Sequence, residues 1–185
     1  RFDEYQVAKY RKTAAQILSP AIEETAAADR RLYQDHGSLL RLLHELGVPP
    51  PTALRDALAH ALNGMVKEAL STLPLDGERI RDLIQQAATA GVRLDSIPLE
   101  LTLRKTIEPL ANRFFADTHD TAALLALADA AVLARNLPFY VSLWMLQNRC
   151  FGLSEALHAS EKSDPVWLEA FHRLCDALKL RIGVT

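Results

Sequence analysis

The sequence has few of the residues that build β-sheets. Ile and Val supply only 7 and 8 of its 185 residues, whereas Leu supplies 32 and Ala 28. β-Branched side chains favour strands, while Leu and Ala lose little conformational freedom on entering a helix. This ratio excludes a large sheet, and the hydrophobic content of 49% excludes a disordered chain. The composition therefore predicts an all-α protein.

Cysteine and glycine are scarce as well. The two cysteines, Cys150 and Cys175, are too few for a disulfide scaffold, and neither belongs to a Cys-x-x-Cys pair of the kind that holds structural zinc. Both occupy apolar positions, so we expect free core thiols, which are typical of a reducing compartment and favour a cytoplasmic location. The 7 glycines are spread singly and form no phosphate-binding loop. We therefore expect neither a metal nor a cofactor.

The chain lacks an excess of charge of either sign and lacks a long apolar run. Its 21 basic and 23 acidic residues give a net charge of −2, which creates no global field to attract nucleic acid or an anionic lipid surface. No apolar stretch approaches the roughly 20 residues that cross a bilayer. We expect no nucleic-acid partner and no membrane partner.

Proline, glycine and capping residues divide the chain into about eight predicted helices. Residues 1–47 should hold the leading helices, with breaks at Ser19-Pro20 and near Gly37, and an end at Gly47. Residues 48–185 should form three antiparallel helical hairpins. The predicted pairs are residues 52–70 with 76–90, 98–115 with 118–135, and 138–158 with 165–178.

The predicted helix ends recur with a period near 44 residues. Gly47, Gly91 and Asn136 each precede an apolar residue, and each is of a type that adopts the left-handed conformation at a helix end. One more step of this length reaches Lys179. A two-helix solenoid would show this period, and so would a bundle of similar hairpins. We favour a helical bundle in a single domain, and because the sequence starts at Arg1 we expect a C-terminal fragment of a larger protein.

The predicted helix over residues 138–158 is apolar over more than half of its circumference, so we expect it to be the most buried helix. A second stripe on it combines aromatic rings with amides. Such a surface suits a sugar, because rings stack on a pyranose and amides bond its hydroxyls. The candidate carbohydrate contacts are Tyr140, Trp144 and Gln147. The interpretation that we favour over sugar binding is that Trp144 fills the core while Gln147 and Asn148 satisfy backbone groups of a neighbouring helix.

Three segments carry a family resemblance. They read YQDHGSLLRLLHELGVPPP (residues 33–51), AATAGVRLD (87–95) and LWMLQNRCF (143–151). Together they resemble the C-terminal helical region, domain-of-unknown-function family 3536, of bacterial proteins whose N-terminal part is a glycoside hydrolase family 57-like catalytic domain. The resemblance implies an accessory, non-catalytic domain that supports or walls a carbohydrate-active domain. It also implies two partners, the N-terminal catalytic domain of the same polypeptide and an α-glucan.

The resemblance carries no catalytic residue into this chain. Family 57 enzymes use two carboxylates on a β/α barrel, and no segment here matches the barrel or its motifs. The histidines and cysteines form no paired catalytic set and are more typical of surface and core positions. We therefore rank a helical enzyme last. A freestanding helical module for protein–protein interaction is the main alternative to the accessory domain.

Overall fold

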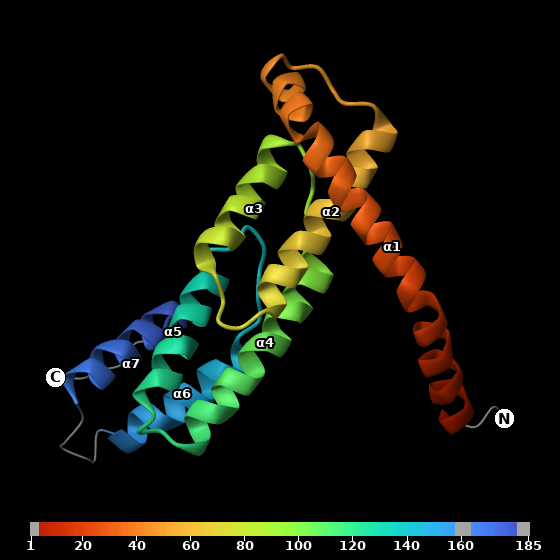
Figure 1. Ribbon diagram of the computed structural model, residues 1–185. Coiled ribbons are helices and arrows are strands. Elements are labelled where there is room, and N and C mark those ends of the chain that lie inside the picture. The colour runs from red at the N-terminus through yellow and green to blue at the C-terminus, as the bar shows by residue number, and fades with distance from the viewer. Residues whose placement is uncertain (1–3, 158–163, 181–185) are drawn as a thin grey trace. The chain divides into compact units, whose positions relative to one another are not determined.

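The computed structural model describes residues 4–157 and 164–180, and these residues form seven α-helices without a β-strand (Figure 1). The all-α prediction is confirmed. The helices are α1 (Glu4–Glu45), α2 (Thr52–Ser71), α3 (Gly77–Thr89), α4 (Ser96–Ala116), α5 (Thr121–Arg135), α6 (Trp144–Leu157) and α7 (Pro165–Ala177). The predicted start of the first helix and the predicted helix end at His158 lie outside the described residues.

The leading part of the chain is one helix, where the sequence predicted several. α1 continues through Pro20 and Gly37, so the two predicted breaks are wrong (Figure 1). Ser19 does not act as a helix cap, since its Oγ donates a 2.9 Å hydrogen bond to Glu23 Oε1 one turn later. A proline removes only one backbone donor, and 42 residues of helix retain enough other hydrogen bonds to pass it.

Aspartates begin three of the helices. Asp76 Oδ1 accepts hydrogen bonds from the backbone N–H groups of Glu78 and Arg79 at the start of α3. Asp120 accepts from Ala123 N at 2.9 Å before α5, and Asp164 accepts from Val166 N at 3.2 Å before α7. Each carboxylate satisfies N–H groups that have no partner inside the helix. The cap of α5 is therefore Asp120, two residues later than the predicted helix start.

The left-handed helix ends follow the predicted period with one exception. Gly47, Gly91 and Lys179 have φ angles of 66°, 64° and 57°. After each one, the next N–H bonds a carbonyl five residues back, as in Val92 N to Ala87 O at 2.8 Å, which closes a Schellman motif. Asn136 has a φ of −93°, so the predicted left-handed end of α5 is wrong.

The helix α6 begins six residues later than predicted. Residues 136–143 are not helical, and α6 starts at Trp144. The backbone N–H of Ser142 donates to Glu100 Oε1 of α4 at 3.3 Å, so a contact distant in sequence holds this segment on α4. Leu143 O then accepts the first hydrogen bond of the helix, from Gln147 N at 2.9 Å.

The most buried helix is α5, so the prediction that residues 138–158 hold this position is wrong. In the described part of α6, only Leu146, Cys150 and Ser154 are buried. α5 buries seven residues along its 15, and most of them are alanines that let neighbouring helices approach closely. They are Ala123, Leu124, Leu127, Ala128, Ala130, Ala131 and Ala134.

The chain forms two compact units. The first comprises Arg1–Met65 and Asp82–Leu94, and the second comprises Val66–Arg81 and Asp95–Thr185. Helices α2 and α3 therefore contribute residues to both units. Each unit has its own buried residues and its own groove.

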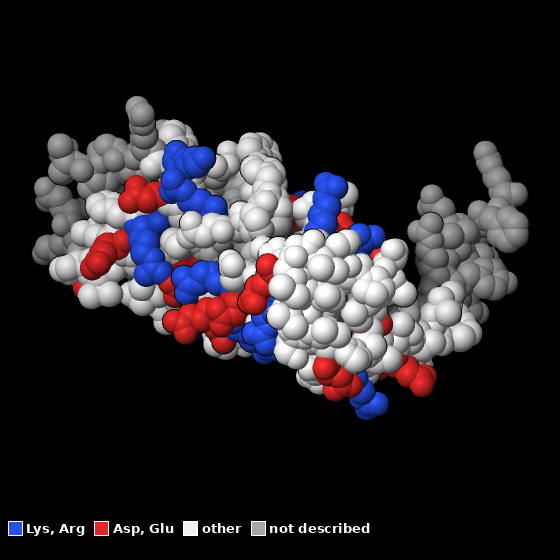
Figure 2. Space-filling model, turned by 90° about the horizontal axis from the view of Figure 1, so that it is seen from above, with Lys and Arg blue, Asp and Glu red and all other residues white. Residues whose placement is uncertain are grey.

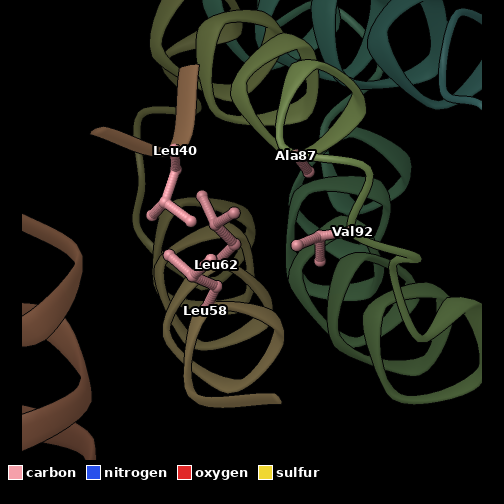
Figure 3. Packing of buried hydrophobic residues seen from close by; sticks show 5 residues of the cluster. All are labelled: Leu40, Leu58, Leu62, Ala87 and Val92. Carbon is pink, nitrogen blue, oxygen red and sulfur yellow. The ribbon is translucent and has the colours of Figure 1, made fainter. Parts of the chain in front are cut away.

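The core of the first unit joins α1, α2 and α3. Leu40 of α1 points toward Leu58 and Leu62 of α2, and Ala87 of α3 and Val92 complete the cluster (Figure 3). All five are buried. Leucines at positions 58 and 62 lie one turn apart, so they present a single apolar face to their neighbours.

In the second unit, α5 packs against both α4 and α7. Arg135 Nη1 donates a 2.6 Å hydrogen bond to Asp176 O, and Arg173 forms an ion pair with Asp129. Cys150 and Cys175 are free and buried, as the sequence predicted. Their apolar surroundings make them small core residues.

Candidate functional site

A groove in the second unit lies between α4 and the start of α6. Its volume is about 500 Å³. It brings together the beginning of α6, the segment before it and about three turns of α4. Its lining residues are Leu101, Arg104, Lys105, Ile107, Glu108, Ala111, Asn112, Ser142, Leu143, Trp144, Met145, Leu146 and Arg149. The groove is therefore apolar along its length with polar groups at intervals.

Trp144 is the most unusual residue of this groove. It is the first residue of α6 and its exposed fraction is 62%, while its neighbour Met145 is 68% exposed. Single exposed apolar side chains are common on protein surfaces, but here two adjacent ones line the same groove. The hydrogen bond from Ser142 N to Glu100 Oε1 fixes the backbone two residues before Trp144 to α4, and this contact positions the residue that carries the indole.

The polar groups of the groove are held in place by neighbours. Arg149 Nη1 donates to Asn112 Oδ1 at 2.8 Å, and its guanidinium carbon lies 4.0 Å from the centre of the Phe115 ring. The guanidinium is thus oriented by an amide and a cation–π contact. Arg104 Nε lies 3.5 Å from Glu100 Oε1. The lining contains three cationic side chains and one carboxylate, so it carries a local positive charge.

The structure does not bring the three predicted contact residues together. Tyr140 is 82% exposed but precedes α6, so it does not share a helix face with Trp144. Gln147 is half-buried and its Nε2 donates to Leu178 O at 2.9 Å, which is the alternative role for this amide. Of the three predicted contact residues, only Trp144 lines the groove. The prediction that these residues share one stripe is wrong, because the helix starts too late.

The sequence did not predict the polar residues that line the groove with Trp144. Asn112 of α4 and Arg149 of α6 are 37 residues apart in the chain, and their hydrogen bond depends on how the two helices pack. The sequence contained only a weak indication of the polar residues that line this groove. Glu108 follows Arg104 by four residues and Lys105 by three on α4, so it shares a side of that helix with each of them.

The buried cysteines are poor nucleophiles. Burial and, to a smaller extent, the neighbouring Cys175 raise the pKa of Cys150 to about 12. Burial and, to a smaller extent, Asp176 raise the pKa of Cys175 to about 12. Since the thiolate is the reactive form, neither thiol is activated near neutral pH. Among the residues that the structure describes, no three His, Cys, Asp or Glu side chains form a group that could hold a metal ion.

The described residues on the face seen in Figure 2 show no preference for one sign of charge. On the face seen in Figure 2, Lys and Arg side chains lie beside Asp and Glu side chains rather than gathering by sign. No helix in the described ranges combines the length and the apolar character needed to cross a bilayer. The groove at Trp144 is therefore a better candidate for a binding site than the charged side chains on this face.

Comparison of the chain with protein-family models, with curated proteins and with solved structures found no match.

Proposed function

We propose that this chain is a non-catalytic accessory domain of a glycoside hydrolase-like protein and that its groove at Trp144 contacts an α-glucan. The observation that carries the proposal is the open indole of Trp144 beside fixed polar groups. A pyranose ring has an apolar face of C–H groups and an edge of hydroxyls. The indole suits the face, and the polar side chains of the groove suit the edge.

The polar groups supply complementary hydrogen bonds. Asn112 retains amide donors beyond the oxygen that Arg149 occupies, and Glu108 offers carboxylate acceptors. Ring stacking and each neutral hydrogen bond contribute about 1 kcal/mol net, so a single groove of this kind binds sugar in the millimolar range. An accessory contact of this strength adds to a catalytic domain by holding the substrate near it.

The partner in this proposal is an N-terminal catalytic domain of the same polypeptide, in a bacterial protein that acts on α-glucans. This chain supports or walls the catalytic domain and performs no hydrolysis itself. Incubation of the chain with maltooligosaccharides should release no reducing ends above buffer. Activity that a single Asp or Glu substitution in this chain abolishes would contradict the proposal.

Tryptophan fluorescence tests the contact directly, because the chain has only two tryptophans. Trp167 is 6% exposed and donates to Thr118 O at 2.7 Å, so its emission should be insensitive to sugar. Titration with maltoheptaose should shift the emission of the wild-type chain. Trp144→Phe should show no shift, since only Trp167 remains to emit. Binding measured by calorimetry should persist in Trp144→Phe and be lost in Trp144→Ala.

Two exposed residues outside the groove provide matched controls. Asn148→Ala alters an exposed position of the same helix, and Tyr140→Ala removes an exposed ring that does not line the groove. Both variants should bind maltoheptaose like the wild type. Absence of any shift at high sugar concentration, or equal binding by Trp144→Ala, would reject the sugar contact.

A protein-interaction module is the second candidate function, and a specific feature favours it. Met145 and Leu101 are exposed in the same groove, and Ile97 lies exposed one turn before Leu101 on α4. An acidic amphipathic helix would match these side chains and the cations at the rim. The coding region upstream of Arg1 distinguishes the candidates. Several hundred residues of alternating strands and helices there would support the accessory domain, and their absence would support the interaction module.

A further inference from the structure

A second groove lies within the first unit, between α1 and α3. Its volume is about 500 Å³, and most of the residues that line it carry a polar side chain. α1 contributes Tyr33 and Arg41, which stand two turns apart, and α3 contributes Gln85, Gln86 and Thr89. Residues three, four or eight apart project from one side of a helix, so the two helices face each other with their polar sides.

A hydrogen bond spans this groove. The hydroxyl of Tyr33 donates to Gln86 Oε1 at 2.5 Å, across 53 residues of sequence. This bond fixes the amide so that the two N–H donors of Gln86 Nε2 remain for another acceptor. Burial raises the pKa of Tyr33, and the positive charge of Arg41 opposes part of this rise. Tyr33 and Arg41 both line the groove, so a ligand held there can meet the hydroxyl and the guanidinium together.

Other polar side chains of the groove are without protein partners. In the part of the chain that the structure describes, no hydrogen bond engages the side chains of Gln34, Gln85 or Thr89. Among the described residues that line the groove, Arg41 is the only one with a charged side chain, so no carboxylate of the lining balances it. The groove thus presents amides, hydroxyls and one cation.

Gly37 leaves room on the α1 side of the groove. A Cβ atom at this position would have only Tyr33 Cζ within 4.0 Å, so no side chain fills the space between the turns. A compact ligand can therefore lie against the backbone of α1 and reach groups on both helices.

We propose that this groove binds a small hydroxylated organic anion, with Arg41 on its carboxylate or phosphate and Gln85 and Gln86 on its hydroxyls. A guanidinium fork matches both oxyanions with two parallel hydrogen bonds. Side-chain amides offer a donor and an acceptor to each hydroxyl. A neutral sugar would leave the charge of Arg41 unused, and the mixed charge of the surface gives no reason for a polymeric anion.

Nuclear magnetic resonance of the intact chain tests the proposal with three probes. Gluconate carries a carboxylate, glucose 6-phosphate carries a phosphate, and glucose carries neither. At least one anion should shift the resonances of Arg41 Nε and of the Gln86 side-chain amide, with an affinity at least tenfold above that of glucose. Binding of only one anion supports the proposal and identifies the acidic group. Equal binding of glucose, or no shift with either anion, would overturn it.

A matched pair of substitutions separates the site from general charge effects. Arg41→Gln should weaken anion binding at least tenfold, and Arg31→Gln, an exposed position of α1 outside the groove, should leave it unchanged. Both variants should unfold at the wild-type temperature, because both side chains are exposed. Tyr33→Phe should also weaken binding, since it releases the amide of Gln86. Wild-type binding by Arg41→Gln would reject the assignment. The groove at Trp144 uses different residues, so either proposal can fail while the other stands.

Discussion

Gln147 Nε2 donates a 2.9 Å hydrogen bond to the backbone carbonyl of Leu178. Leu178 is the C-cap of α7, and the last carbonyls of a helix have no partner inside it. A side chain of α6 thus completes the end of α7. This contact gives the amide of Gln147 a structural role, and it removes Gln147 from the surface available to ligands.

Replacement of Gln147 by Ala should destabilise the second unit. The change removes one hydrogen bond and leaves the half-enclosed carbonyl of Leu178 without its donor, which costs about 1–2 kcal/mol. Urea unfolding followed by the emission of Trp167 measures the effect. Asn148→Ala, at the next and exposed position, should change stability by less than about 0.5 kcal/mol. Equal effects from the two variants would contradict the role given to Gln147.

The two tryptophans should respond differently to substitution. Trp167→Phe removes the indole donor to Thr118 O and alters the stacking on Phe171, whose ring centre lies 5.0 Å away. We expect a loss of about 1–3 kcal/mol in unfolding free energy. Trp144→Phe changes an exposed side chain and should cost less than about 0.5 kcal/mol. Far-UV circular dichroism during thermal unfolding compares the two, and a larger loss in Trp144→Phe would show that the indole of Trp144 is packed.

Local signals account for most of the fold. Prolines, capping aspartates and glycines placed the ends of α2, α3, α4 and α7 within a few residues, because caps depend on nearby backbone groups. The left-handed end at Lys179 falls where the 44-residue period places it, although the residue is not glycine. These features follow from the sequence with little help from tertiary contacts.

The errors have two causes, which are contacts distant in the chain and the capacity of a long helix to continue through a single proline. The hydrogen bond between Ser142 and Glu100 joins residues 42 apart in the sequence and holds the segment before α6 in a non-helical conformation. Tyr140 therefore lies outside the helix on which the stripe was predicted. α1 passes Pro20 although this residue is a strong helix start signal. The second groove was not predicted at all, because Tyr33 and Gln86 are polar residues without a motif. Only the packing of α1 on α3 brings them together.

Stability should fall in alkaline solution because of the buried thiols. The pKa values of Cys150 and Cys175 are about 12 in the folded chain, against an ordinary value of 9.0. Below pH 9 both states keep these protons. Between pH 9 and 12 the unfolded state releases them while the folded state retains them, so the free energy of unfolding decreases with pH.

Denaturant unfolding at several pH values between 8 and 11 checks this dependence. The wild type should lose more stability over the range than a variant with Cys150→Ala and Cys175→Ala, although that variant starts lower because of its cavities. Iodoacetamide should modify the native thiols far more slowly at pH 8 than those of the urea-unfolded chain. Rapid modification of the native chain would show that the thiols are accessible.

Two glycines should give stability changes of opposite sign when replaced by Ala. Gly91 has a φ of 64°, and Gly64 lies inside α2. A Cβ atom at either position would meet nothing within 4 Å, so only the backbone decides the outcome. Ala in the left-handed conformation costs roughly 1–2 kcal/mol, so Gly91→Ala should destabilise the chain by that amount. Ala in a helix restricts the unfolded chain without strain, so Gly64→Ala should stabilise it by about 0.4–1 kcal/mol.

Gly91→Asn should cost less than Gly91→Ala, because Asn tolerates this conformation. Urea midpoints at constant slope measure all three variants, and a neutral Gly91→Ala would show that α3 does not end in a left-handed residue.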